Sequence, residues 1–117
     1  MSGKSFPALL SLAFLLLLAS CAVEPGPLYG TWADNLGDTL SFFDDNTFNA
    51  KIINSDGSSF DNYSGNYSLL LNALTLDCAE PEMRTVTEWD IRGNILYMEW
   101  VTPDRVTRPL KLYKVSN

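Results

Sequence analysis

The sequence predicts an all-β domain over residues 28–117, built as a small eight-stranded antiparallel up-and-down barrel. No stretch of this region repeats its apolar residues with a helical period. Short runs rich in β-branched and aromatic residues instead alternate apolar and polar side chains, which is typical of strands. Gly, Asn, Asp and Pro separate these runs at short, even intervals. Eight strands joined by hairpins can close into a barrel and leave no exposed edge.

Four strands are predicted in the first half of the domain. Phe48, Ala50 and Ile52 share one face of the third, and Asp44-Asp45-Asn46 forms the hairpin before it. Gly65, in the middle of the fourth, predicts a bulge or a sharp bend. The predicted strands are 28–33, 39–43, 47–53 and 59–70.

Four more strands are predicted in the second half, at 73–78, 85–91, 95–101 and 106–115. In 85–91, Glu88 and Asp90 alternate with Thr85, Thr87, Trp89 and Ile91. Such alternation places one set inside the barrel and the other in solvent. The residues predicted to point inward are Leu40, Phe42, Phe48, Ala50, Ile52, Tyr67, Leu69, Leu74, Leu76, Trp89, Ile91, Leu96, Met98, Trp100, Leu110 and Leu112.

The charge balance excludes one class of partner. The chain has 8 Lys and Arg, 14 Asp and Glu and no His, for a net charge of −6. Nucleic-acid binding needs a basic face, so no nucleic-acid partner is expected. An electrostatic partner would be a basic protein, although an acidic surface is also explained by solubility alone.

The residue types argue against catalysis and against a metal site. A nucleophile needs a neighbouring base, and the chain has no His to supply one. The local carboxylate pairs, Glu88 with Asp90 and Asp44 with Asp45, fall on a predicted outer face and in a turn. The acidic turns 44–46 and 54–57 lack the ligand spacing of a calcium loop. We therefore expect no enzyme activity, no catalytic residue, no metal ligand and no cofactor.

The first 21 residues form a tripartite pattern. Lys4 provides a positive start, residues 8–18 are apolar, and Leu18-Ala19-Ser20 precedes Cys21. The pattern resembles the lipobox of bacterial lipoprotein signal peptides. The resemblance implies cleavage between Ser20 and Cys21, a diacylglycerol thioether on Cys21, and acylation of the new amino terminus, typically with palmitate. Several acyl chains make a stable membrane anchor.

The lipobox resemblance divides the chain into a signal peptide (1–20), a lipidated tether (21–27) and one domain (28–117). It places the protein in the bacterial cell envelope. Ala22 follows the lipidated cysteine where an Asp would signal retention at the inner membrane, which favours the outer membrane. Lipidation of Cys21 leaves Cys78 without a disulfide partner, and its apolar surroundings predict a small buried residue.

Gly30-Thr31-Trp32 resembles the Gly-x-Trp signature at the start of the first strand of lipocalins. The eight-strand pattern and the final Leu110-Lys111-Leu112-Tyr113-Lys114 extend the resemblance over most of residues 28–115. In lipocalins a basic residue near the end of the last strand packs on the signature Trp, usually an Arg. The resemblance therefore implies that Lys114 lies over Trp32 as a cation–π lid. The chain is much shorter than a lipocalin.

Two non-catalytic functions remain open. Lipocalin-like barrels hold small apolar ligands, which implies a site at Phe42, Phe48, Tyr67, Trp89, Met98 and Trp100, unless these side chains simply fill the barrel. Small β-barrel lipoproteins also include inhibitors of host lysozyme, a basic protein. Ser64-Gly65-Asn66-Tyr67 is similar to the Ser-Gly-x-x-Tyr element of such inhibitors, with the Tyr one residue early.

Overall fold

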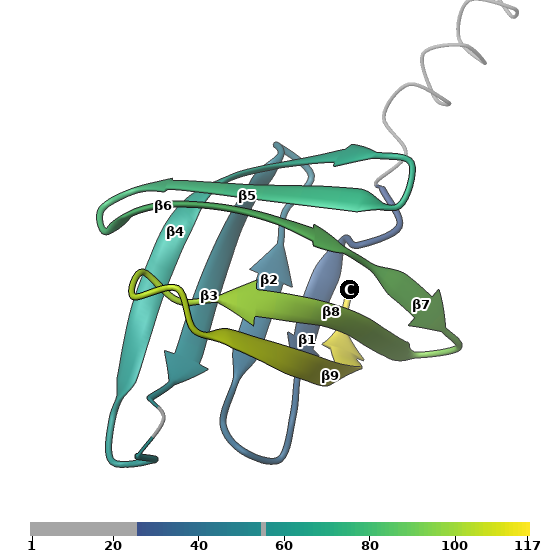
Figure 1. The fold of residues 1–117 in the computed structure, drawn as a ribbon. Helices are drawn as coiled ribbons and strands as arrows, with labels where there is room; N and C mark the ends of the chain where they lie inside the picture. The colour runs from purple at the N-terminus through teal and green to yellow at the C-terminus, as the bar shows by residue number, and fades with distance from the viewer. Residues whose placement is uncertain (1–25, 55) are drawn as a thin grey trace, which may run out of the picture.

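The computed structural model describes residues 26–54 and 56–117, and these residues form nine β-strands and no helix (Figure 1). The signal peptide and Cys21 predicted from the sequence lie outside the described residues. The strands are β1 (Gly30–Ala33), β2 (Thr39–Phe42), β3 (Thr47–Ile53), β4 (Phe60–Leu70), β5 (Ala73–Ala79), β6 (Glu82–Glu88), β7 (Asp90–Arg92), β8 (Ile95–Val101) and β9 (Thr107–Ser116).

The strands form one antiparallel sheet in the order β6-β5-β4-β3-β2-β1-β9-β8-β7. The sheet curls into a half-barrel, so that β8 and β9 lie across from β2 and β3 (Figure 1). Strands β1 and β9 pair with each other, which brings the two ends of the domain together. The predicted all-β, antiparallel architecture is confirmed.

The predicted count of eight strands is wrong, because the strand expected at 85–91 is divided at Trp89. Up to Glu88 the chain pairs with β5, and from Asp90 it pairs with β8. The change of partner separates β6 from β7. The predicted closed barrel is also corrected, since no backbone ladder joins β6 to β8 in the part of the chain that the structure describes.

The core lies on the concave face of the sheet. The predicted inward set is buried there, except that Leu69, Trp89 and Ile91 are only partly buried against its edge. The inward set omitted four further core residues, Leu28, Trp32, Tyr63 and Met83, and the separate prediction that Cys78 is buried is confirmed. Large side chains thus occupy the interior, and their burial supplies the main stabilisation of the fold.

Gly65 lies where β4 passes from one neighbour to the other. It pairs with Phe48 of β3 and with Cys78 of β5, and neither ladder shifts register there. Of the two predicted alternatives, the bulge is therefore absent, and β4 bends gradually along its length (Figure 1). A Cβ at Gly65 would lie 1.9 Å from the backbone oxygen of Asp77. The residue must be Gly because two backbones approach closely.

Candidate functional site: a groove at the open seam

The junction between β1 and β9 is closed by backbone pairing, with Trp32 opposite Lys114. The Lys114 Nζ lies 5.2 Å from the centre of the Trp32 ring, within the range of a cation–π contact. The Trp32 side chain is buried and its indole N–H donates to the Leu28 carbonyl at 2.9 Å. The structure thus brings the two predicted lid residues together, with the polar atom of the Trp satisfied.

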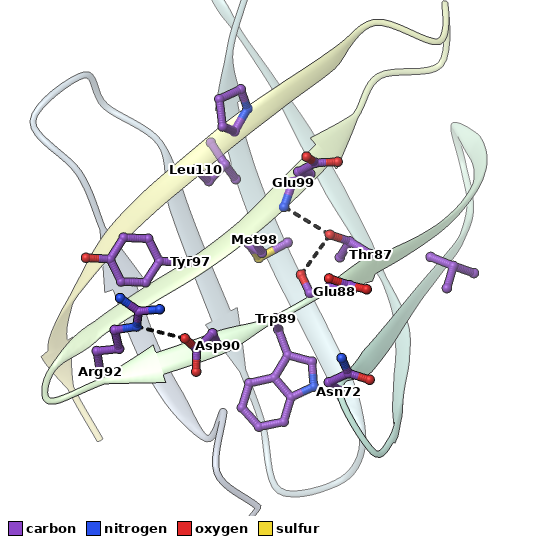
Figure 2. A pocket seen from close by; sticks show the side chains of 12 residues that line it. Asn72, Thr87, Glu88, Trp89, Asp90, Arg92, Tyr97, Met98, Glu99 and Leu110 are labelled. Atoms are coloured by element: carbon purple, nitrogen blue, oxygen red, sulfur yellow. Dashed lines mark hydrogen bonds and ion pairs between the residues drawn. The ribbon is translucent and has the colours of Figure 1, made fainter.

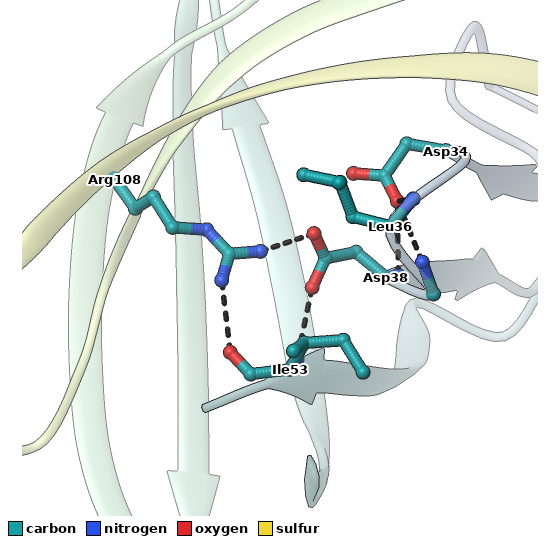
Figure 3. A network of polar contacts seen from close by, with 6 residues as sticks. Asp34, Leu36, Asp38, Ile53 and Arg108 are labelled. Atoms are coloured by element: carbon teal, nitrogen blue, oxygen red, sulfur yellow. Dashed lines mark hydrogen bonds and ion pairs between the residues drawn. The ribbon is translucent and has the colours of Figure 1, made fainter. Parts of the chain in front are cut away.

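An ion pair with a fully buried carboxylate joins β9 to the residue just before β2 and, through hydrogen bonds, to the end of β3 (Figure 3). Asp38 is fully buried and pairs with the guanidinium of Arg108. The Asp38 Oδ1 also accepts the Ile53 N–H at 2.9 Å, and Arg108 donates to the Ile53 carbonyl at 2.8 Å. Each buried polar group therefore has partners, which a buried charge requires.

Most of the predicted ligand-binding residues belong to the packed core. Phe42 stacks edge-on against Tyr67 at 5.0 Å between ring centres and lies 6.5 Å from Phe48. Trp100 is fully buried and packs edge-on against Tyr63 at 5.0 Å. Each of these rings packs against another aromatic ring of the core. Of the six predicted residues, Trp89 and Met98 line a groove that opens to solvent.

The groove lies at the seam where β6 faces β8. Two threonine hydroxyls bridge this seam, which we call the open seam. The Thr87 hydroxyl accepts the Glu99 N–H at 3.0 Å and donates to the Glu88 carbonyl at 2.9 Å. The Thr85 hydroxyl donates to the Val101 carbonyl at 3.4 Å. Side chains thus replace backbone pairing here, and the two strands stay farther apart than in a ladder.

The groove has a volume of about 860 Å³, which is within the usual range for small-molecule sites. Trp89, Met98 and Leu110 follow one another along it (Figure 2). Met98 and Leu110 are buried core residues, so the groove reaches the edge of the core. The lining residues are Asn72, Val86, Thr87, Glu88, Trp89, Asp90, Arg92, Tyr97, Met98, Glu99, Pro109 and Leu110.

The indole N–H of Trp89 is buried and has no hydrogen-bond partner among the described residues. The backbone N–H of the same residue donates to the Asn72 carbonyl at 3.1 Å, which fixes the residue between β6 and β7. An unsatisfied buried donor costs about 1–3 kcal/mol. The indole nitrogen lies on the Asn72 side of the ring (Figure 2), so this unsatisfied donor belongs to a residue of the groove wall. The Trp100 indole N–H also lacks a partner in the part of the chain that the structure describes, but Trp100 lies wholly within the core.

From the sequence, an acidic turn, Cys78 and a carboxylate pair were also considered for catalysis or metal binding. The Asp45 carboxylate accepts the Thr47 N–H and hydroxyl, and these bonds hold its pKa below the usual value. Burial raises the pKa of the Cys78 thiol, which disfavours the reactive thiolate. Glu88 and Asp90 are exposed. Within residues 26–54 and 56–117, no three His, Cys, Asp or Glu residues are grouped to hold a metal ion.

Sequence reasoning missed the polar contacts that shape the half-barrel. The Asp38–Arg108 pair joins residues far apart in the chain, and neither residue belongs to a motif. Thr85 and Thr87 were assigned inward positions by alternation, but nothing in the pattern indicates that their hydroxyls bridge a seam. Sequence reasoning also missed the groove, which exists because β6 and β8 are not joined by backbone hydrogen bonds.

The described residues contain no helix that is long and apolar enough to cross a membrane. The chain matches no protein-family model, and comparisons with curated proteins and with solved structures find no significant similarity.

Proposed function

We propose that this protein is a bacterial envelope lipoprotein whose lipocalin-like half-barrel binds a small, largely apolar ligand in the groove of the open seam. Lipid on Cys21 anchors it, and the outer membrane is the favoured location. The lipobox pattern at residues 18–21 supports the anchor. The Gly30-x-Trp32 signature and the contact of Lys114 with Trp32 support the lipocalin-like assignment. The proposed function needs no catalysis and no cofactor.

The free indole N–H of Trp89 carries the assignment of the groove. A buried donor without a partner is rare in folded proteins, and a ligand oxygen would satisfy it. Met98 and Leu110 supply apolar surface beside it. This mixture of apolar surface and a few placed polar groups is typical of small-molecule sites. Phe42, Phe48, Tyr67 and Trp100 act in this proposal as packing residues, not as ligand contacts.

Native mass spectrometry of the protein from its own envelope tests this proposal. We expect a non-covalent mass excess that is lost on collisional activation, in addition to the covalent lipid. Val86→Trp, which places a ring at the wall of the groove, should reduce the excess. Val106→Trp is the matched control, because Val106 is similarly exposed (54% against 63% for Val86) and lies outside the groove. A bare protein, or equal loss in both variants, would contradict ligand binding in the groove.

A second candidate is an interaction module for a basic protein. The filled core favours it, as does an exposed apolar group at the β4–β5 hairpin and on β6. Leu70, Leu71 and Val86 are 76%, 87% and 63% exposed, on a chain of negative net charge. Pull-down of basic envelope or host proteins, lysozyme included, tests this alternative. Capture that Leu71→Glu abolishes while the bound small molecule is retained would support it.

A further inference from the structure

We propose that the groove selects its ligand by charge, taking amphiphiles with a positively charged head in preference to anionic ones. This inference rests on the proposed function, because it concerns the ligand class of the same groove. It follows from three features of the lining. These are two carboxylates without an ion-pair partner, one arginine already engaged, and the free N–H of Trp89.

The two carboxylates belong to Glu88 and Glu99, which lie on opposite sides of the open seam. Both side chains lie beside Thr87 (Figure 2). Both residues are exposed, and neither takes part in an ion pair within the described residues. The Glu99 backbone N–H is bonded to Thr87, which holds this part of β8 beside β6. A cationic head at this point would be attracted by two negative charges.

Arg92 is the one cationic residue of the lining, and it is poorly placed to hold an anion. Its Nε donates to the Asp90 carboxylate at 2.9 Å, so a neighbouring charge already neutralises it. Its guanidinium also lies 5.6 Å from the centre of the Tyr97 ring. An anionic head would have to compete with Asp90 for Arg92. It would also be repelled by the carboxylates of Glu88 and Glu99. The lining as a whole is therefore electronegative.

The indole N–H of Trp89 adds a second requirement. It needs an acceptor oxygen, which an ammonium group cannot provide. The ligand that satisfies the whole groove has an apolar chain against Met98 and Leu110, and an ester or amide oxygen within reach of Trp89. Its cationic head lies beside Thr87, between Glu88 and Glu99 (Figure 2). An acylated amine or a choline ester has this arrangement.

Photo-crosslinking on the full protein tests the charge preference. The protein is produced from the complete sequence, extracted from the envelope and placed in nanodiscs of digalactosyldiacylglycerol, a lipid that has no charge and no choline head. Three probes carry the same decanoyl chain with a terminal diazirine and a carbonyl oxygen, and differ in head-group charge. They are decanoylcholine (cationic), monodecanoylglycerol (neutral) and decanoate (anionic). Mass spectrometry of peptides quantifies the labelling of residues 86–99.

We expect decanoylcholine to label the groove about three- to tenfold more than decanoate at equal concentration, with monodecanoylglycerol in between. Glu88→Gln combined with Glu99→Gln should remove most of this difference. Asp44→Asn combined with Asp61→Asn removes the same charge at exposed positions outside the groove and should leave the difference unchanged. Higher salt should reduce the difference in the unmodified protein.

The outcomes separate this inference from the proposed function. Labelling of the groove by monodecanoylglycerol with equal labelling by the two charged probes would overturn the charge preference alone. No labelling of the groove by any probe would overturn the proposed function as well. If the Asp44 and Asp61 variant loses the preference to the same extent, the net charge of the protein is responsible, and the assignment to Glu88 and Glu99 is wrong.

Discussion

At the β1–β9 junction, backbone hydrogen bonds join the first strand to the last, whereas at the open seam two threonine hydroxyls span the space between β6 and β8. Each place has its own tryptophan. Trp32 is buried, with its N–H bonded and a lysine over its ring, while Trp89 is half-buried with its N–H free. The difference shows that one side of the half-barrel is completed by backbone pairing, and the other is bridged by side chains beside a donor that has no partner among the described residues.

The largest expected difference between the two sides concerns the tryptophan side chains. Trp32→Ala should lower the free energy of unfolding by about 3–5 kcal/mol, because it leaves a cavity in the core. Trp89→Ala should cost about 1–2 kcal/mol, since less apolar surface leaves water at that position. Urea unfolding measures both. Equal costs would contradict the view that the open seam contributes less to stability.

The next contrast compares two ion pairs, Asp38–Arg108 at one end of the half-barrel and Asp90–Arg92 at the groove. Asp38→Asn should cost about 2–3 kcal/mol, because Arg108 is left partly buried without its counter-charge. Arg108 is 30% exposed, so the cost stays below that of a fully buried pair. Asp90→Asn, at the exposed pair with Arg92, should cost less than about 0.5 kcal/mol. Urea midpoints of the two variants decide, and a larger loss for Asp90→Asn would reverse the ranking.

The bridge across the open seam should be weaker than a backbone ladder. Thr87→Val keeps the shape of the side chain but removes the acceptor of the Glu99 N–H, at a cost of about 1–2 kcal/mol. Hydrogen exchange at the Glu99 amide should accelerate accordingly. Thr75→Val on β5 is the control, because Thr75 lies between the inward residues Leu74 and Leu76 and faces outward. Unchanged exchange at Glu99 in the Thr87 variant would show that the bridge does not hold the seam.

Alternation of apolar and polar residues predicted most of the fold correctly. Strands β3 and β8 have the predicted bounds, and the inward residues of β2, β3, β5 and β9 are those expected. These elements are each buried on one face, and burial on one face is what a period of two encodes. Turn residues such as Asp45 also act locally, through bonds to a residue two positions away.

The open seam could not be predicted in the same way. The alternation through Thr87, Trp89 and Ile91 is uninterrupted, so it shows no sign that the chain changes its pairing partner at Trp89. Whether a sheet closes depends on strand stagger and tilt. These are properties of all the strands together and cannot be predicted from one segment of sequence. The groove and its free N–H result from that geometry. For the same reason, ligand contacts were predicted at Phe42, Phe48, Tyr67 and Trp100, which the structure packs into the core.

The smallest predicted effects concern the two indole N–H groups and have opposite signs. Trp32→Phe removes the bond to the Leu28 carbonyl and should destabilise the protein by about 1 kcal/mol beyond the loss of ring area. Trp89→Phe removes a donor that has no partner, so the ligand-free protein should be unchanged or more stable by up to about 1 kcal/mol. Ligand affinity should nevertheless fall, by roughly five- to tenfold, because the acceptor oxygen loses its donor. Urea unfolding and a monodecanoylglycerol titration measure these effects. Loss of stability in Trp89→Phe with unchanged affinity would mean that the N–H already has a partner within the fold, and the two sides would then differ only in backbone pairing.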